Sequence, residues 1–377
     1  MKWVTALLLA AFAALACGVG GTDIKHFGIP TLADKRGQFD FALNDPQTHL
    51  FFAADKADHG VDVFEGTTSD LVFRQTIALG TEPHGLTLAP DLRRVYVGTL
   101  DGTIQVIDVT PTSQSFLKVM AKIKMGAPKG IDLMGYDTVH HKLFAAAPDN
   151  STLFDIDALR NIVTKAINTK KGIEEPVFNA ADGMLYVTVN PANSLYKIDP
   201  VADRIVSESI ISPDCKGPYG LAINQKTQQA MIACDKLPVL WDLKHERAIR
   251  SFGEVGFGDQ VVYDSVSDRF FIAGMNSNSI VAIFGGSPVR FYNSVQTHAN
   301  SRAVAYDPRT RVIFQPDSNR SKSGVLAFNL PDPEPDRGSW WLPLLYFVGL
   351  VLFGAFIWYY GKRKAEERKR LGRPMFS

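Results

Sequence analysis

The most constraining feature of the sequence is one short pattern of predicted strands that recurs along most of the chain. The copy with the sharpest boundaries spans residues 82–108. Its apolar runs at 95–97 and 104–107 are separated by a turn containing Asp101 and Gly102, and Pro90 ends an earlier run. Apolar side chains alternate with a period of two, which is typical of β-strands. Pro and Gly are the residues that interrupt strands and form turns.

The pattern recurs seven times with a period of 40–49 residues. Its second strand begins at Leu50, Val95, Leu143, Leu185, Ala230, Phe270 and Val312. This spacing, with several strands in each copy, predicts the blades of a β-propeller. A helical repeat would place apolar residues three and four positions apart, which this chain does not do. We therefore expect an all-β, seven-bladed β-propeller over residues 22–330.

The two ends of the repeat region predict how the ring closes. A fourth strand follows each of the first six copies, but the seventh copy is followed by the Pro-rich residues 331–339. An apolar stretch at residues 23–29 has no partner of its own. A ring closed by a strand from the other terminus has no open edges. We expect residues 23–29 to pair with residues 324–329 in the last blade.

The chain begins with features of a secretory signal. Residues 1–16 contain Lys2, an apolar core and an Ala-Leu-Ala sequence that is typical of a signal-peptidase site. The apolar run is too short to cross a bilayer, which excludes a first transmembrane helix. A bacterial lipobox ending at Cys17 is the alternative.

Residues 340–360 carry no charge and have aromatic residues at both ends, which predicts a transmembrane helix. Residues 331–339 form the expected linker, and residues 361–377 form a tail that is strongly basic. The positive-inside rule places this tail in the cytoplasm and the propeller in an extracellular, lumenal or periplasmic space. The overall net charge of +1 argues against a nucleic-acid partner.

Only two of the three cysteines, Cys215 and Cys234, fall within the repeats. Cys215 precedes the predicted inner strand of the fifth blade, and Cys234 ends the second strand of that blade. These strands are antiparallel neighbours, so both residues lie toward the same face. We expect a disulfide bond, because such pairs persist in an oxidising compartment.

The unit PHGLTLAPDLRRVYVGTLDGTIQVID resembles the YVTN-repeat, YncE-like β-propellers, which are related in form to the SMP-30/gluconolactonase and lactonase propellers. The resemblance covers residues 22–330 and implies the fold more than the function. The repeats are WD40-like in layout, but no copy has the Gly-His and Trp-Asp signature. Common catalytic motifs such as G-x-S-x-G and H-E-x-x-H are missing from the sequence.

The candidate binding site is a ring of polar residues where the predicted inner strands begin. In a propeller these starts line one mouth of the central channel. The expected ring consists of Gln38, His84, Lys129, Glu175, Tyr219, Asp259 and Arg302. Polar groups gathered in a concave funnel pair with one another or bind a ligand. A solvated channel whose charges satisfy one another is the alternative.

The resemblance to gluconolactonases implies a second use of this ring. In that family, acidic residues and Asn at inner-strand starts hold a divalent metal, and Glu175 and Asp259 match two of those positions. Oxygen ligands of this kind suit Ca²⁺ or Mg²⁺. Lys129 and Arg302 would oppose cation binding, so we expect no metal cofactor. Glycosylation sequons occur at Asn150 and Asn319.

These observations favour a membrane-anchored, extracytoplasmic binding module over an enzyme. The expected partner is a small polar ligand or a protein that binds at the channel mouth, in addition to the membrane itself. The alternative function is a lactonase-like hydrolase, with or without a divalent metal.

Overall fold

A computed structural model of the protein describes residues 22–32, 36–67, 70–275, 279–318, 323–329 and 341–371. The expected signal peptide at 1–16, Cys17 and the linker at 331–339 lie outside these residues. The chain divides into two compact units, Met1–Pro331 and Asp332–Ser377.

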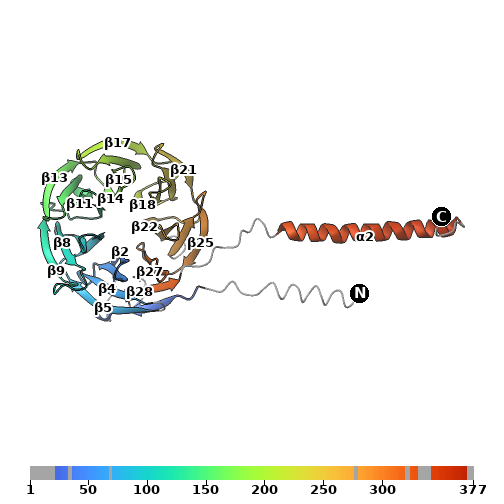
Figure 1. The fold of residues 1–377 in the computed structure, drawn as a ribbon, viewed down its shortest axis with the longest axis horizontal. Helices are drawn as coiled ribbons and strands as arrows, with labels where there is room; N and C mark the ends of the chain where they lie inside the picture. The colour runs from blue at the N-terminus through green and yellow to red at the C-terminus, as the bar shows by residue number, and fades with distance from the viewer. Residues whose placement is uncertain are drawn as a thin grey trace. The chain divides into compact units, whose positions relative to one another are not determined.

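The first unit is a ring of seven four-stranded antiparallel sheets around a central channel (Figure 1). The predicted seven-bladed, all-β propeller is therefore confirmed. In each of the first six blades, the strands follow chain order from the channel to the rim.

The strands of the first three blades occur at regular intervals along the chain. Blade 1 comprises β2 (Phe39–Asp45), β3 (Leu50–Asp55), β4 (Gly60–Gly66) and β5 (Leu71–Ala78). Blade 2 comprises β6 (Pro83–Ala89), β7 (Arg94–Thr99), β8 (Thr103–Asp108) and β9 (Val119–Lys124). Blade 3 comprises β10 (Met134–Asp137), β11 (Lys142–Ala147), β12 (Thr152–Asp157) and β13 (Ile162–Asn168).

The remaining blades continue the same order. Blade 4 comprises β14 (Ile173–Asn179), β15 (Met184–Val189), β16 (Ser194–Asp199) and β17 (Arg204–Ile210). Blade 5 comprises β18 (Pro218–Asn224), β19 (Gln229–Cys234), β20 (Val239–Asp242) and β21 (Arg247–Ser251). Blade 6 comprises β22 (Gly258–Asp264), β23 (Arg269–Gly274), β24 (Ile280–Gly285) and β25 (Arg290–Gln296). Two short 3₁₀ helices, η1 (Pro30–Leu32) and η2 (Pro148–Asn150), lie between strands.

Blade 7 closes the ring with strands from both ends of the repeat region. It comprises β26 (Ala305–Asp307), β27 (Val312–Asp317), β28 (Gly324–Asn329) and β1 (Lys25–Gly28). Strand β1 pairs antiparallel with β28, with Lys25 opposite Ala327. The expected closure by the N-terminal strand is confirmed. It satisfies the outer edge of β28, which would otherwise be an exposed template for aggregation.

Each innermost strand ends in a tight turn that fixes the register of its hairpin. In blade 3, Asp137 Oδ1 accepts hydrogen bonds from the backbone N–H groups of Val139 (2.8 Å) and His140 (3.1 Å). Such local bonds are the reason that Asp and Asn favour turns. The equivalent residues of the seven blades are Asp45, Ala89, Asp137, Asn179, Asn224, Asp264 and Asp307. Only blade 2, with Ala89, lacks a capping side chain at this position.

The hydrophobic core is divided into seven clusters, each of which lies between two neighbouring blades. Between blades 1 and 2, for example, Phe52 and Val63 pack in one cluster with Val95 and Ile107. A single blade therefore cannot bury its apolar faces alone. The stability of the propeller depends on contacts between blades.

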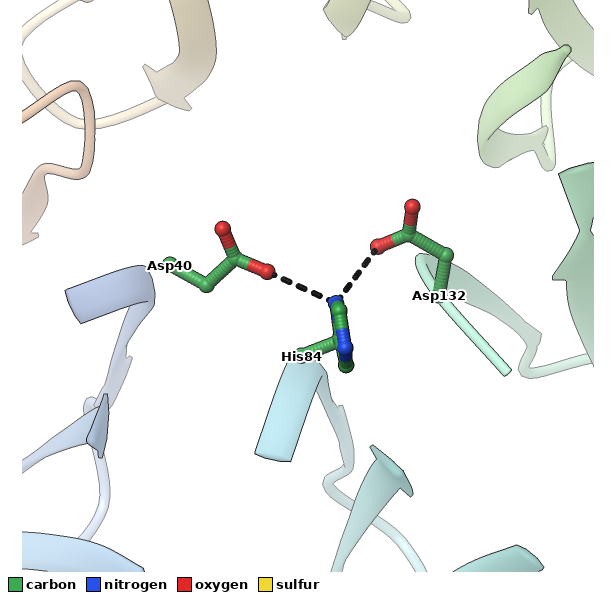
Figure 2. Close-up of side chains that lie close together, drawn as sticks. All are labelled: Asp40, His84 and Asp132. Carbon is green, nitrogen blue, oxygen red and sulfur yellow. Dashed lines mark ion pairs between the residues drawn. The ribbon is translucent and has the colours of Figure 1, made fainter. Parts of the chain in front are cut away.

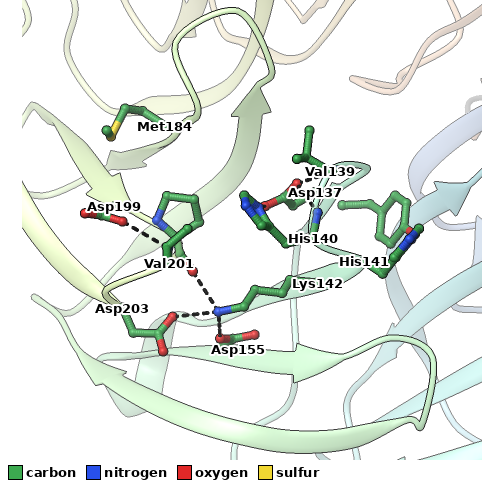
Figure 3. Close-up of polar contacts among 12 residues, drawn as sticks. Asp137, Val139, His140, His141, Lys142, Asp155, Met184, Asp199, Val201 and Asp203 are labelled. Atoms are coloured by element: carbon green, nitrogen blue, oxygen red, sulfur yellow. Dashed lines mark hydrogen bonds and ion pairs between the residues drawn. The ribbon is translucent and has the colours of Figure 1, made fainter.

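Polar contacts also join neighbouring blades. Lys142 Nζ in blade 3 lies 2.6 Å from Asp155 Oδ2 in the same blade, and 3.1 Å from Asp203 Oδ1 in blade 4 (Figure 3). It also donates to the carbonyl oxygen of Pro200, at 2.7 Å. This lysine thus holds the turn that follows β16 against blade 3.

A disulfide bond joins Cys215 to Cys234, as expected from their places in blade 5. Their Cα atoms are 5.2 Å apart, and both side chains are fully buried. The bond connects the loop before β18 to the end of β19.

The second unit contains helix α2 (Trp341–Arg370). Among the described residues, no helix combines the length and the apolar content that a membrane crossing requires. This finding corrects the expected transmembrane helix at 340–360. The helix also continues beyond Tyr360 through the charged residues that the sequence analysis assigned to a separate tail.

Candidate ligand-binding site at the channel mouth

Seven side chains at one equivalent position form a ring at the channel mouth. In blade 1 this position is bracketed by the pairs Phe39–Asp55 and Ala42–Ala53, with a bulge between them. Counting back five residues from the end of each innermost strand gives the same position in every blade. The ring consists of Asp40, His84, Asp132, Glu174, Tyr219, Asp259 and Arg302. All seven side chains are polar and partly exposed.

The structure places four of the expected ring residues at this position, namely His84, Tyr219, Asp259 and Arg302. In the other three blades the expected residue is displaced along the chain. Gln38 precedes the ring position by two residues and Lys129 by three, and both are exposed. Glu175 follows the ring position by one. In blades 1 and 4 a bulge interrupts the pairing of the innermost strand at this point, and its extra residues make simple alternation miscount the start of the strand.

Glu175 lies between two blades and does not face the mouth as its neighbour Glu174 does. Its Oε2 accepts a hydrogen bond from the backbone N–H of Leu221 in blade 5, at 3.2 Å. Gly220 makes room for this contact, because a Cβ there would lie 2.9 Å from that oxygen and 2.4 Å from the carbonyl oxygen of Asp259. Glu175 is thus a structural bridge beneath the ring.

Gln260 forms a similar bridge at the same level. Its Oε1 accepts hydrogen bonds from the N–H groups of Ala42 (3.1 Å) and Val304 (3.0 Å). Its Nε2 donates to the carbonyl oxygen of Ala42, at 2.6 Å. Gln260 therefore ties blade 6 to blades 7 and 1, where the bulges leave backbone groups without strand partners.

The part of the ring from blades 1 to 3, here the first arc, consists of Asp40, His84 and Asp132 (Figure 2). His84 Nδ1 lies 3.0 Å from Asp40 Oδ2 and 3.8 Å from Asp132 Oδ1. Lys56 Nζ approaches the same oxygen of Asp40, at 2.8 Å. One imidazole nitrogen thus faces two carboxylates.

The part of the ring from blades 4 to 7, here the second arc, consists of Glu174, Tyr219, Asp259 and Arg302. Arg302 Nε lies 3.4 Å from Asp259 Oδ2, and the Arg302 guanidinium lies over the Tyr219 ring, 5.5 Å from its centroid. Glu174 makes no hydrogen bond or ion pair with any other residue that the structure describes. The second arc therefore has one carboxyl group without a partner.

The four acidic side chains of the ring have pKa values that are shifted by different amounts and in different directions. Burial, together with the negative charges of Asp132 and Asp259, raises the pKa of Glu174 to about 9. Burial also raises the pKa of Asp259 to about 7, although Arg302 opposes it. Asp132 is raised to a pKa of about 6 by burial and by Asp40. Burial acts on Asp40 too, but hydrogen bonds from His84 and Lys56 outweigh it and lower its pKa. The mouth therefore has more acidic groups than its basic groups neutralise.

A cavity of about 610 Å³ lies along the channel on the C-terminal side of the ring. Its lining is mainly apolar and includes Phe41, Leu86 and Tyr306, with Glu175 and Gln260 among its polar residues. A concave apolar space with a few polar groups at one end is the usual form of a ligand pocket. The volume is sufficient for a small organic molecule.

In the described part of the chain, one set of three metal-ligating residues converges on a common point, namely Asp40, His84 and Asp132. Glu175 and Asp259, the ligands implied by the gluconolactonase resemblance, belong to no such set of three among the described residues. Asp40 and Asp132 were not among the ring residues expected from the sequence. Counting back five residues from the turn residue that ends each innermost strand gives both positions.

The two sequons differ in what the structure shows. Asn150 ends η2 and is partly buried, with its Oδ1 enclosed. Asn319 lies outside the described residues.

Comparison with known proteins supports the fold. No protein-family model matches the chain, and no curated protein matches it significantly. Among solved structures, a chain of the "Crystal Structure of Mitotic Checkpoint Complex" aligns with a TM-score of 0.66 and 10% sequence identity. The alignment covers 83% of this chain and 92% of that one. At this identity the likeness establishes a β-propeller and does not extend to ligands.

Proposed function

We propose that this protein is a binding module whose channel mouth takes an organic cation, such as an ammonium or guanidinium group. The observation that carries the proposal is the unpartnered carboxyl of Glu174, which faces the mouth beside Asp132 and Asp259. Its pKa of about 9 keeps this carboxyl protonated at neutral pH, because an ionised carboxyl here would be costly without a paired charge. A bound cation would supply that paired charge, lower the pKa and favour the ionised form.

Two sources of this chemistry fit the site. The apolar cavity next to the ring favours a small molecule that has a hydrocarbon part behind its charged end. The fold favours a protein partner that inserts a Lys or Arg side chain, because β-propellers commonly act as protein-binding modules. The charged group is the same in both cases, so one experiment addresses both.

We also propose that the propeller works in an oxidising, extracytoplasmic compartment. The disulfide between Cys215 and Cys234 supports this location, because buried structural disulfides are rare in the reducing cytosol.

Binding is favoured over the lactonase-like hydrolysis that the sequence left as an alternative. Glu175 is held by the N–H of Leu221, and Asp259 is paired with Arg302. These contacts leave the two residues poorly placed to share a catalytic metal ion.

The test is the substitution Glu174→Gln, which removes the ionisable carboxyl and keeps the shape of the side chain. Two probes, agmatine and an Arg-containing pentapeptide, are titrated into the full chain by calorimetry in the presence of a chelator. We expect the wild type to bind at least one probe. Loss of a charged hydrogen bond of about 1.5–3 kcal/mol should weaken binding roughly 10- to 100-fold in the variant.

The matched control is Glu65→Gln, which neutralises a glutamate that pairs with Arg74 on blade 1, outside the ring. It should bind the probes like the wild type. Equal binding by Glu174→Gln and the wild type, or no binding of either probe, would contradict the proposal. A preference for agmatine indicates a small ligand, and a preference for the peptide indicates a protein partner.

A further inference from the structure

We infer that Asp40, His84 and Asp132 form a binding site for a divalent transition-metal ion such as Zn²⁺. The site is the first arc of the channel mouth (Figure 2). It adjoins the cation site proposed at Glu174, because Asp132 borders both, but it does not depend on that proposal.

The potential ligand atoms of Asp40, His84 and Asp132 lie close to one another. Nδ1 of His84 and one carboxylate oxygen from each aspartate all lie within 4.8 Å of one another. Ligand atoms in tetrahedral coordination at bond lengths of roughly 2.0–2.2 Å are about 3.4 Å apart. The distances from His84 Nδ1 to Asp40 Oδ2 (3.0 Å) and to Asp132 Oδ1 (3.8 Å) lie on either side of this value. Small side-chain rotations would therefore bring all three onto one ion.

A single proton on His84 cannot give both carboxylates a hydrogen bond. His84 Nδ1 is within hydrogen-bonding distance of Asp40 Oδ2, at 3.0 Å, but lies 3.8 Å from Asp132 Oδ1. A single N–H group donates well to one of two such acceptors, and the other is left without its bond. A divalent ion in the same place would contact all three groups.

The backbone at the level of the ring also brings these residues together. Gly85 follows His84, and a Cβ at this position would lie 2.6 Å from the carbonyl oxygen of Asp132. A Cβ at Gly98 would lie 2.5 Å from the same oxygen. Two glycines thus allow blade 2 to approach the chain of blade 3 closely at the level of the ring. The side chains of Asp40, His84 and Asp132 remain 34%, 21% and 30% exposed, so an ion from solvent can reach them.

The ligand set selects the class of metal. Imidazole nitrogen with two carboxylate oxygens suits Zn²⁺ and its neighbours, whereas Ca²⁺ and Mg²⁺ prefer oxygen ligands alone. Three protein ligands leave at least one position open for water or for a ligand in the mouth.

One neighbouring charge opposes the metal. Lys56 Nζ lies 2.8 Å from the Asp40 oxygen that would bind the ion. Lys56 therefore competes for Asp40, and its removal should strengthen metal binding. This opposite effect provides a sharp test, because general damage to the fold would not produce it.

The experiment titrates Zn²⁺ alone into the full chain, purified without a polyhistidine tag, and follows heat and thermal stability. We expect one ion per chain and a rise in Tm with zinc concentration. His84→Ala and Asp132→Asn should each weaken binding at least tenfold, and Lys56→Ala should tighten it several-fold. Co²⁺ in place of Zn²⁺ should give an absorption spectrum that His84→Ala abolishes.

The control is His140→Ala, since His140 makes a similar pair with Asp137 (2.6 Å) but belongs to no set of three metal-ligating groups in the part of the chain that the structure describes. Its zinc affinity should equal that of the wild type. If His84→Ala lowers the Tm in the absence of metal, His84→Gln replaces it. Zinc binding that survives both Asp132→Asn and the His84 variant would overturn the inference. So would the absence of binding, or weaker binding in Lys56→Ala. None of these results bears on the Glu174 assay, which is run with a chelator.

Discussion

The channel mouth and the interfaces between blades are built from the same innermost strands but have opposite chemistry. In blade 3, Asp132 faces the mouth with a partly exposed carboxyl, and two residues later Met134 is buried in the cluster between blades 2 and 3. The interfaces hold apolar side chains that stabilise the ring. The mouth gathers like charges that cost stability. This difference indicates that the interfaces, and not the mouth, maintain the fold.

The largest expected effect is at an interface. Phe314 of β27 is fully buried and stacks on Phe51 of blade 1, with ring centroids 4.9 Å apart. Phe314→Ala should lower the free energy of unfolding by about 3–5 kcal/mol, because it leaves a cavity where blades 7 and 1 meet. Urea denaturation measures this change. Phe257→Ala, at a side chain that is 56% exposed, is the control and should change stability by less than about 0.5 kcal/mol. A similar loss in both variants would contradict the comparison.

The next effect concerns the disulfide of blade 5, whose two cysteines are 19 positions apart in the sequence. Replacing Cys215 and Cys234 by Ala should cost about 3 kcal/mol, through the greater freedom of the unfolded chain. Thermal denaturation with and without a reductant measures this cost. The reductant should destabilise the wild type and leave the double variant unchanged. Binding of the cationic probe to the folded double variant should persist, and its loss would show that the bond also shapes the site.

The smallest expected change in the free energy of unfolding is a gain, and it comes from a substitution in the mouth. The pKa of Glu174 is raised to about 9 in the folded chain, where Asp132, Asp259 and Asp40 face it and Arg302 partly compensates. A carboxyl with a raised pKa favours the folded state fully at low pH, and this contribution is lost as the pH rises toward 9. Glu174→Gln should therefore match the wild type near pH 4 and become more stable as the pH rises toward 9, by about 1 kcal/mol once solvent screening of this partly exposed side chain is allowed for.

Chemical denaturation at several values between pH 4 and pH 9 measures this difference. Glu208→Gln is the control, because Glu208 pairs with Lys170 and its pKa is lowered, not raised. That variant should show no gain at alkaline pH. If the difference in stability between Glu174→Gln and the wild type does not change with pH, the raised pKa of Glu174 is refuted.

The fold could be predicted from the sequence because each repeat corresponds to one blade. The alternation in each copy identified the strands. The unpartnered stretch at 23–29 identified the closing strand, which is β1. The disulfide followed from the antiparallel pairing of β18 and β19. These inferences depend on pairing between neighbouring strands, which local patterns reflect well.

The site was only partly predictable, because its register depends on a bulge that alternation does not reveal. In blade 3, the ring residue was expected at Lys129, whereas counting back from the turn residue Asp137 gives Asp132. The same count gives Asp40 in blade 1. The turn residues were thus the better reference, since their hydrogen bonds fix the register of each hairpin.

Side-chain contacts between blades could not be predicted from the sequence at all. Arg302 of blade 7 reaches Tyr219 of blade 5, and Glu175 of blade 4 bonds to the backbone of blade 5. Such contacts depend on the curvature of the ring and on the direction of single side chains. No local pattern encodes either of them.

The closing strand has a consequence for the way the protein is made. Strand β1 is the first strand to leave the ribosome, but its partner β28 ends at Asn329 and is among the last parts of the propeller to be synthesised. Until then, the nascent chain is an incomplete arc in which Phe51 has no Phe314 to cover it. The apolar surface between the first and last blades therefore remains exposed throughout translation. A growing chain of this design needs protection at that one surface until its two ends meet.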